Sequence, residues 1–168
     1  MKKILIIVPD GGMLFEAAGI ADILMQANRL HGAQHAAPRY RITLATTQPH
    51  QVIHGQSGLN LLADNRLTVL DPFEPRDTIM ITGRGTHADE GDAVASWVRM
   101  AAPHTRRVTS ICGGAMLLAQ AGLLDAALMM SEATLPGEQC WRRLREVSDD
   151  QPLPYFSTIL VNKQWEEA

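Results

Sequence analysis

A short apolar run near the N-terminus constrains the fold more than any other feature of this chain. Residues 3–8 read KILIIV, without the alternation of polar and apolar positions that marks a half-exposed strand. Such a run is typical of a strand buried on both faces of a parallel sheet. The turn residues PDGG follow, and residues 14–30 then carry apolar side chains at helical spacing. The chain therefore opens with a strand-helix unit of an α/β fold.

The same alternation continues along the chain. Further strands are predicted over 40–47, 78–82, 106–111 and 157–162, helices over 91–102, 114–124 and 138–147, and a short hairpin or edge piece over 55–67. Strands alternating with helices predict a doubly wound, flavodoxin-like, mostly parallel sheet with helices on both faces. Ligands bind beyond the carboxyl ends of the strands in such sheets, so the loops after Val8, Thr82 and Ile111 are the ones to examine.

Composition excludes several classes of protein. The chain has 168 residues, which suits one domain, and a net charge of −3 with no long basic run, so we expect no nucleic-acid binding by this chain alone. The two cysteines, Cys112 and Cys140, form no CxxC pair, and we expect no metal and no cofactor. The first apolar run is too short for a secretion signal or a membrane span, which predicts a cytoplasmic protein.

Cys112 is the strongest candidate for chemistry. It lies between a predicted strand and a predicted helix, with Ser110 two positions before it and Gly114 two positions after it. Small residues at these positions allow the sharp strand-to-helix turn of a nucleophile elbow. The backbone N–H of Gly113 could then stabilise an oxyanion. A small apolar residue at a buried corner is the alternative, and the spacing alone leaves both open.

Two more loops at the same edge of the sheet carry candidate groups. Glu16 stands near the start of the first helix, where the helix dipole favours a carboxylate, although a lone glutamate there is more often a surface residue. Residues 83–85, GRG, end the strand 78–82 and could present backbone N–H groups to the cleft. His87 is the histidine that topology places at the cleft, as a base for Cys112, with a solvated loop histidine as the alternative.

With these residues in view, the chain resembles the ThiJ/PfpI superfamily of class I glutamine-amidotransferase-like domains. It is most similar to the N-terminal domain of AraC-type transcription regulators and to the isonitrile hydratases. The matching stretches are GGMLFEAAGIADILMQANRL, YRITLATT, SGLNLLAD, DTIMITGRG and RRVTSICGGAMLLAQAGLLD, within residues 3–125. The resemblance implies that Cys112 is the elbow cysteine and Glu16 the acidic group near it. It also implies that Gly83 and Arg84 form the loop on the oxyanion side, next to Gly85.

Three departures from the family pattern bear on function. Gly113 stands where many relatives have Thr or His, and Arg84 stands where a second glycine is usual. The family segment GRRATTHW becomes AALMMSEA, so the position of the family histidine falls on or near Glu132, which becomes a pocket candidate. Residues 158–168, TILVNKQWEEA, resemble the strand pair that precedes the family's last strand and helix, and we expect a single domain over residues 1–168 that lacks those two elements.

These observations support three interpretations. The first is a ligand-sensing domain of an AraC-type regulator, homodimeric as family members commonly are, and without turnover because the histidine is replaced. The second is a cysteine-dependent enzyme of the isonitrile hydratase or small-amide hydrolase type, with Cys112 as nucleophile and Glu16 as acid or base. The third is a dimerising domain whose cysteine is only redox-sensitive.

Overall fold

Strand β1 (Lys2–Val8) is the centre around which the sheet is built. It pairs in parallel with β2 (Tyr40–Thr46) on one side and with β6 (Arg76–Ile81) on the other. The side chains of residues 4–8 are at most 4% exposed. The computed structural model describes residues 1–33, 37–83, 88–124, 127–131, 139–141 and 157–161. The buried strand expected from KILIIV is therefore confirmed.

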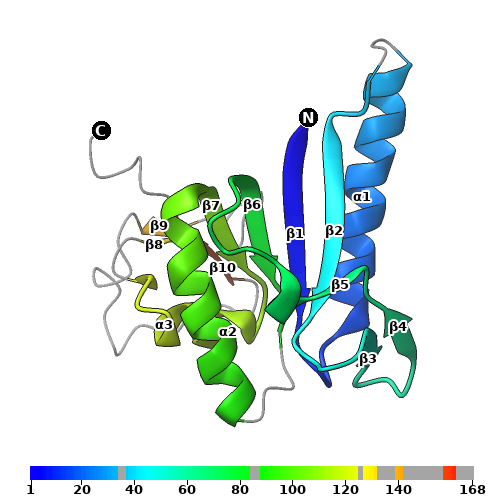
Figure 1. Ribbon diagram of the computed structural model, residues 1–168. Helices are drawn as coiled ribbons and strands as arrows, with labels where there is room; N and C mark the ends of the chain where they lie inside the picture. Colours follow the sequence, from blue (N-terminus) through cyan, green and yellow to red (C-terminus); the bar gives the residue numbers. More distant parts are fainter. Residues whose placement is uncertain (34–36, 84–87, 125–126, 132–138, 142–156, 162–168) are drawn as a thin grey trace.

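The main sheet follows the order β5-β2-β1-β6-β7-β10-β8-β9 within the described residues (Figure 1). The remaining strands among the described residues are β3 (Val52–His54), β4 (Asn60–Leu62), β5 (Asn65–Arg66), β7 (Thr105–Ser110), β8 (Ala127–Ser131), β9 (Gln139–Trp141) and β10 (Ser157–Val161). The five strands from β5 to β7 are parallel, whereas β10, β8 and β9 continue the sheet antiparallel. Strands β3 and β4 form a separate hairpin. The fold is thus the mostly parallel α/β arrangement that the sequence predicts.

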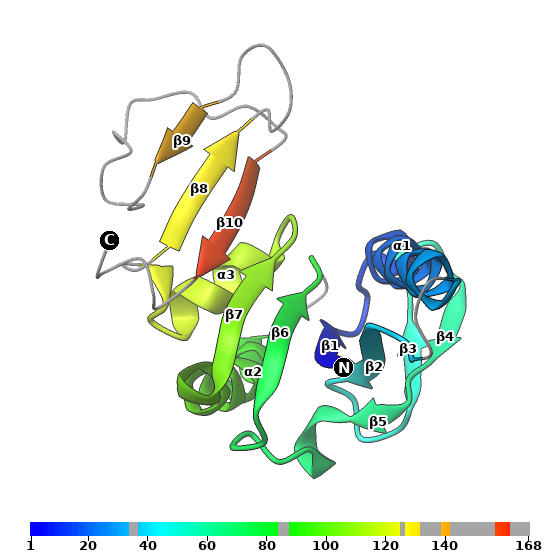
Figure 2. The ribbon, with the colours of Figure 1, turned by 90° about the horizontal axis from the view of Figure 1, so that it is seen from above.

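Helices cover the two faces of the sheet at different places (Figure 2). In the part of the chain that the structure describes, the helices are α1 (Leu14–Gly32), α2 (Ala88–Ala101) and α3 (Gly114–Gln120), with short 3₁₀ turns at Leu67–Val69 and Ala102–His104. Alternate residues of β1 point to opposite faces of the sheet. Ile6 packs in a cluster with Ala17 of α1, and Ile7 packs in a second cluster with Val98 of α2 and Leu118 of α3. No helix in the described part of the chain is both long and apolar enough to span a membrane.

Two predicted helices differ from the structure. The helix expected over 138–147 is wrong at residues 139–141, which form β9 and pair antiparallel with β8. Cys140 is therefore an exposed strand residue and not a helical one. The helix expected over 114–124 ends at Gln120, because Gly122 takes a φ of 70° and its N–H turns back to the Ala119 carbonyl.

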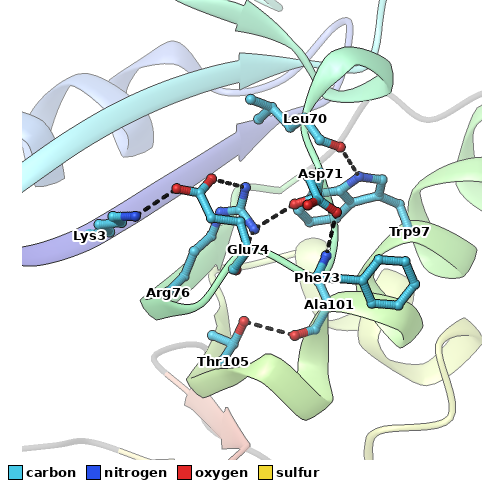
Figure 3. Close-up of polar contacts among 9 residues, drawn as sticks. All are labelled: Lys3, Leu70, Asp71, Phe73, Glu74, Arg76, Trp97, Ala101 and Thr105. Atoms are coloured by element: carbon cyan, nitrogen blue, oxygen red, sulfur yellow. Dashed lines mark hydrogen bonds and ion pairs between the residues drawn. The ribbon is translucent and has the colours of Figure 1, made fainter.

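The amino ends of the strands carry a network of ion pairs. Glu74 accepts hydrogen bonds from Lys3 at 2.7 Å and from Arg76 at 3.0 Å, and the Arg76 guanidinium lies 5.3 Å from the centre of the Trp97 ring (Figure 3). Beside it, both oxygens of Asp77 accept from Arg106 at 2.8 Å. These contacts join β1, β6 and β7 at the edge opposite the loops expected to carry function.

We expect Asp77 to make stability depend on pH. The hydrogen bonds from Arg106 hold the pKa of Asp77 down at about 2, against 3.8 for an unperturbed carboxyl. Because the folded pKa lies below the unfolded one, the contribution is complete above pH 4 and is lost as the pH falls towards 2. Asp77→Asn should cost about 1–2 kcal/mol at pH 7, reduced from the full shift because Arg106 is partly exposed.

Unfolding free energies from denaturant titration at pH 7, 4 and 3 measure this. The difference between wild type and Asp77→Asn should shrink with falling pH, while Asp22→Asn, an exposed position on α1, serves as the control. A difference that stays constant from pH 7 to 3 would contradict the argument.

Candidate functional site

Cys112 occupies a strained turn between β7 and α3. Its φ is 51°, and it is the only non-glycine residue with a positive φ in the described part of the chain. This left-handed conformation costs about 1–2 kcal/mol for a residue with a side chain, so its surroundings must hold it in place. The side chain is exposed. The turn therefore presents the thiol to solvent from a left-handed backbone conformation, and a nucleophile elbow at Cys112 stays a prediction.

Two glycines allow this turn to sit directly on the end of β6. A Cβ on Gly114 would lie 2.5 Å from the Ile81 carbonyl oxygen and 3.0 Å from that of Thr82. A Cβ on Gly83 would lie 2.8 Å from the Gly113 nitrogen and 2.9 Å from the Cys112 Cβ. The shortest distance at each glycine, 2.5 Å at Gly114 and 2.8 Å at Gly83, is too short for a real Cβ atom, so neither position accepts a side chain without a shift of the backbone.

Glu16 reaches the same point from the first turn of α1. Its half-buried carboxylate accepts a hydrogen bond from the Gly83 N–H at 2.7 Å, across 67 residues of sequence. The Gly83 carbonyl in turn accepts from the Met13 N–H at 3.3 Å. Gly83 thus touches the Cys112 turn on one side and Glu16 on the other. The structure brings together four predicted site residues: Glu16, Gly83, Cys112 and Gly113.

The two candidate oxyanion donors, the N–H groups of Gly83 and Gly113, differ in whether they already have an acceptor. The Gly83 N–H is already used by Glu16. The Gly113 N–H has no acceptor among the residues that the structure describes. A carbonyl oxygen bound beside Cys112 could therefore take one backbone donor from Gly113, but a second from Gly83 only if Glu16 released it.

The remaining candidates lie outside the described residues. They are Arg84, Gly85, His87 and Glu132, and their roles at the pocket stay predictions. Within the described ranges, no group of three or more histidine, cysteine or carboxylate side chains is placed to hold a metal ion.

The hairpin β3–β4 supports the loop that leads from β1 to Glu16, and the sequence did not predict these contacts. The hairpin β3–β4 packs against the segment after β1: the Gly11 N–H donates to the His54 carbonyl at 2.7 Å, and the Gln56 N–H donates to the Gly12 carbonyl at 3.1 Å. The Asp10 carboxylate accepts from the His54 backbone N–H at 3.0 Å and lies 3.2 Å from its ring Nδ1. The PDGG turn after β1 predicts a turn, but Asp10 bonds to a residue 44 positions away, so no local pattern of the sequence indicates this contact.

The geometry can now be compared with known proteins. The model of the DJ-1/PfpI family matches residues 2–139, which is most of the chain. The chain belongs to the DJ-1/PfpI family. The family assignment confirms the resemblance drawn from residues 3–125.

Solved structures of this family share the fold of the chain. Oxidized DJ-1 from Toxoplasma gondii superposes with a TM-score of 0.60 at 20% identity, covering 76% of this chain and 65% of that one. An AraC family transcriptional regulator from Pseudomonas putida superposes with a TM-score of 0.59 at 20% identity, covering 75% and 64%. The chain thus spans slightly less than two thirds of the length of these proteins. At this identity the likeness shows the fold alone.

A different protein matches a short stretch very closely. The cobalt-precorrin-2 C(20)-methyltransferase of Salmonella typhimurium is 86% identical over 52 residues, which are 31% of this chain and 22% of that enzyme. The identity is high, but less than a quarter of the methyltransferase is represented. The match therefore does not change the assignment of the chain to the DJ-1/PfpI family.

We expect Gly114→Ala to destabilise the DJ-1/PfpI fold by about 2 kcal/mol or more, because its Cβ would press on the Ile81 carbonyl. Gly19→Ala is the matched control: this glycine lies inside α1, and nothing lies within 4 Å of an added Cβ. It should stabilise the helix by about 0.5–1 kcal/mol.

Denaturant titration of both variants measures these effects. If Gly114→Ala is recovered only as insoluble protein while Gly19→Ala is soluble, this also shows that Gly114→Ala destabilises the fold. Equal stability of the two variants would show that the elbow does not need close contact with β6.

Proposed function

We propose that this chain is the ligand-sensing DJ-1/PfpI domain of an AraC-type transcription regulator in the cytoplasm, and that it performs no turnover. The observation that carries the proposal is the hydrogen bond between Glu16 and the Gly83 N–H. In this bond the candidate acid, Glu16, and one candidate oxyanion donor, the Gly83 N–H, bind each other, so neither is free to bind a substrate. Cys112 stays exposed beside them, while two groups that would assist hydrolysis are bonded to each other.

The position of the family histidine supports the same conclusion. The resemblance aligns it on or near Glu132. A carboxylate near a thiolate repels it and is a weak base at neutral pH. Loss of a positioned general base costs about a hundred- to ten-thousandfold in rate. The fold shared with the Pseudomonas putida AraC family regulator is compatible with a sensor role.

The second candidate is a cysteine-dependent hydratase or hydrolase. The observation in its favour is Cys112 itself, which is exposed at a positive φ and has the unused Gly113 N–H next to it. In this alternative, Glu16 would have to leave Gly83 and act as acid or base. His87 could provide the missing base.

A turnover screen separates the two candidates. Wild type and Cys112→Ser are incubated with isonitriles, small amides and ketoaldehydes, and products are measured by chromatography. We expect no product from wild type above the level of Cys112→Ser. Turnover that Cys112→Ser abolishes and Glu16→Gln reduces would refute the sensor proposal and establish the enzyme.

We also propose that the domain is a homodimer that packs through α1. Three large apolar side chains of this helix are exposed at spacings that keep them on one side: Phe15 at 82%, Ile23 at 71% and Leu30 at 64%. The exposed charges of α1 also suit an antiparallel meeting of two copies, since the helix is acidic at Asp22 and basic at Arg29. Contiguous apolar surface of this kind usually marks an interface.

Sedimentation equilibrium tests the dimer. Wild type should sediment as a dimer and Ile23→Glu as a monomer, because the substitution places two like charges near the two-fold axis. Leu62→Glu, exposed on the hairpin strand β4, is the control and should remain dimeric. A monomeric wild type, or a dimeric Ile23→Glu, would contradict this interface.

The methyltransferase match has a separate explanation. We propose that the matched stretch shares residues with the DJ-1/PfpI match, because the family model leaves only 30 residues unmatched, residue 1 and residues 140–168, and the stretch has 52. No methyl transfer is proposed, because the stretch represents only 22% of that enzyme.

A further inference from the structure

A second polar cleft lies at the edge of the sheet opposite Cys112. It has a volume of about 210 Å³ and opens at the amino ends of the strands. Its polar lining comes from Lys3, Arg41, Thr43, Asn65, Glu74 and Arg76. A six-residue strand such as β6 is roughly 20 Å long, so the cleft is separate from the site built on Cys112.

The strand register places the donors of this cleft on one face. Lys3 of β1 pairs with Arg41 of β2, and two positions on, Leu5 pairs with Thr43. Residues opposite each other in parallel strands point to the same side, so these side chains share the face of Leu5. Asn65 of β5 pairs with Ala45 and continues that face. Arg41 is exposed, and Thr43 and Asn65 are half-buried, so solvent reaches this row of donors.

Charge is unevenly balanced in the cleft. Glu74 holds Lys3 and Arg76 (Figure 3), and Arg76 also donates to the backbone carbonyls of Asp71 and Glu74 at 2.9 Å. The Arg41 side chain makes no hydrogen bond and no ion pair with any residue that the structure describes, although its charge helps to lower the pKa of Glu74. The lining residues thus include three cations and one carboxylate, with the Asp71 carboxylate acting on Arg76 from outside the lining, and the guanidinium of Arg41 remains available.

We propose that this cleft binds a compact dianion of the phosphomonoester type, with Arg41 and Lys3 contacting the phosphate oxygens and Asn65 and Thr43 adding neutral donors. Arginine presents a planar pair of N–H groups that matches phosphate, and such charge-assisted bonds are the strong ones. The volume limits the ligand to something smaller than a typical drug-sized molecule. The site does not depend on the proposed sensor function at Cys112.

Glu74 gives the proposal a distinctive signature. Its carboxylate competes with a bound anion for Lys3, so removing its charge should strengthen binding rather than weaken it. Glu74→Gln keeps the shape of the side chain and one acceptor oxygen for Lys3 or Arg76. Removing the Arg41 charge should have the opposite effect. A merely structural role for these residues would not give changes of opposite sign.

Isothermal titration with inorganic phosphate at pH 8 and constant ionic strength tests the proposal on the full chain. We expect saturable binding to wild type, at least about tenfold weaker binding to Arg41→Gln, and severalfold tighter binding to Glu74→Gln. Arg29→Gln, an exposed arginine of α1, is the matched control and should bind like wild type. Nitrate, a monoanion, should not displace phosphate at the same concentration.

Several results would overturn the site. They are a lack of saturable phosphate binding by wild type, an affinity of Arg41→Gln equal to that of wild type, or a loss of affinity in Arg29→Gln as large as in Arg41→Gln. Weaker binding by Glu74→Gln would also contradict it, provided that thermal unfolding shows this variant to be folded. None of these outcomes bears on whether Cys112 supports turnover.

Discussion

The contact between Gly83 and the turn at Cys112 is the constraint on which the rest of the site depends. Backbone meets backbone here, because added Cβ atoms at Gly83 and Gly114 would overlap the Gly113 nitrogen and the Ile81 carbonyl. Only this close approach keeps Cys112 at a φ of 51°. The hydrogen bond from Gly83 to Glu16 then ties α1 to the same point. Three loops that are far apart in sequence become one rigid corner.

Much of this corner could be predicted from the sequence for simple reasons. KILIIV is apolar without alternation, so it had to be buried on both sides, and this fixed β1 at the centre. Parallel strands place their carboxyl ends together, so Glu16, Gly83 and Cys112 were expected at one edge. Pairwise hydrogen bonds were not predictable. The hydrogen bond from the Gly83 N–H to Glu16 depends on how closely two loops approach each other, and the spacing of residues in the sequence does not predict that distance.

The errors arose where local pattern and tertiary pairing disagree. The stretch 138–147 carries helix-favouring residues, yet residues 139–141 gain more from antiparallel pairing with β8 than from a local helix. The hairpin support behind the loop after β1 was missed for the opposite reason. Its contacts are between backbone groups and Asp10, so they leave no apolar period in the sequence.

The two ends of the sheet now have different chemical characters. At the carboxyl ends, a carboxylate is satisfied by a backbone N–H beside a thiol. At the amino ends, Lys3, Arg41 and Arg76 outnumber Glu74. Coupling between two sites requires an element with two discrete arrangements that each ligand favours differently. Strand β1 connects the ends, but it is hydrogen-bonded on both sides and buried between two apolar clusters. A strand held in this way resists sliding, so we expect an anion bound at Arg41 to leave the turn at Cys112 unchanged within one copy of the domain.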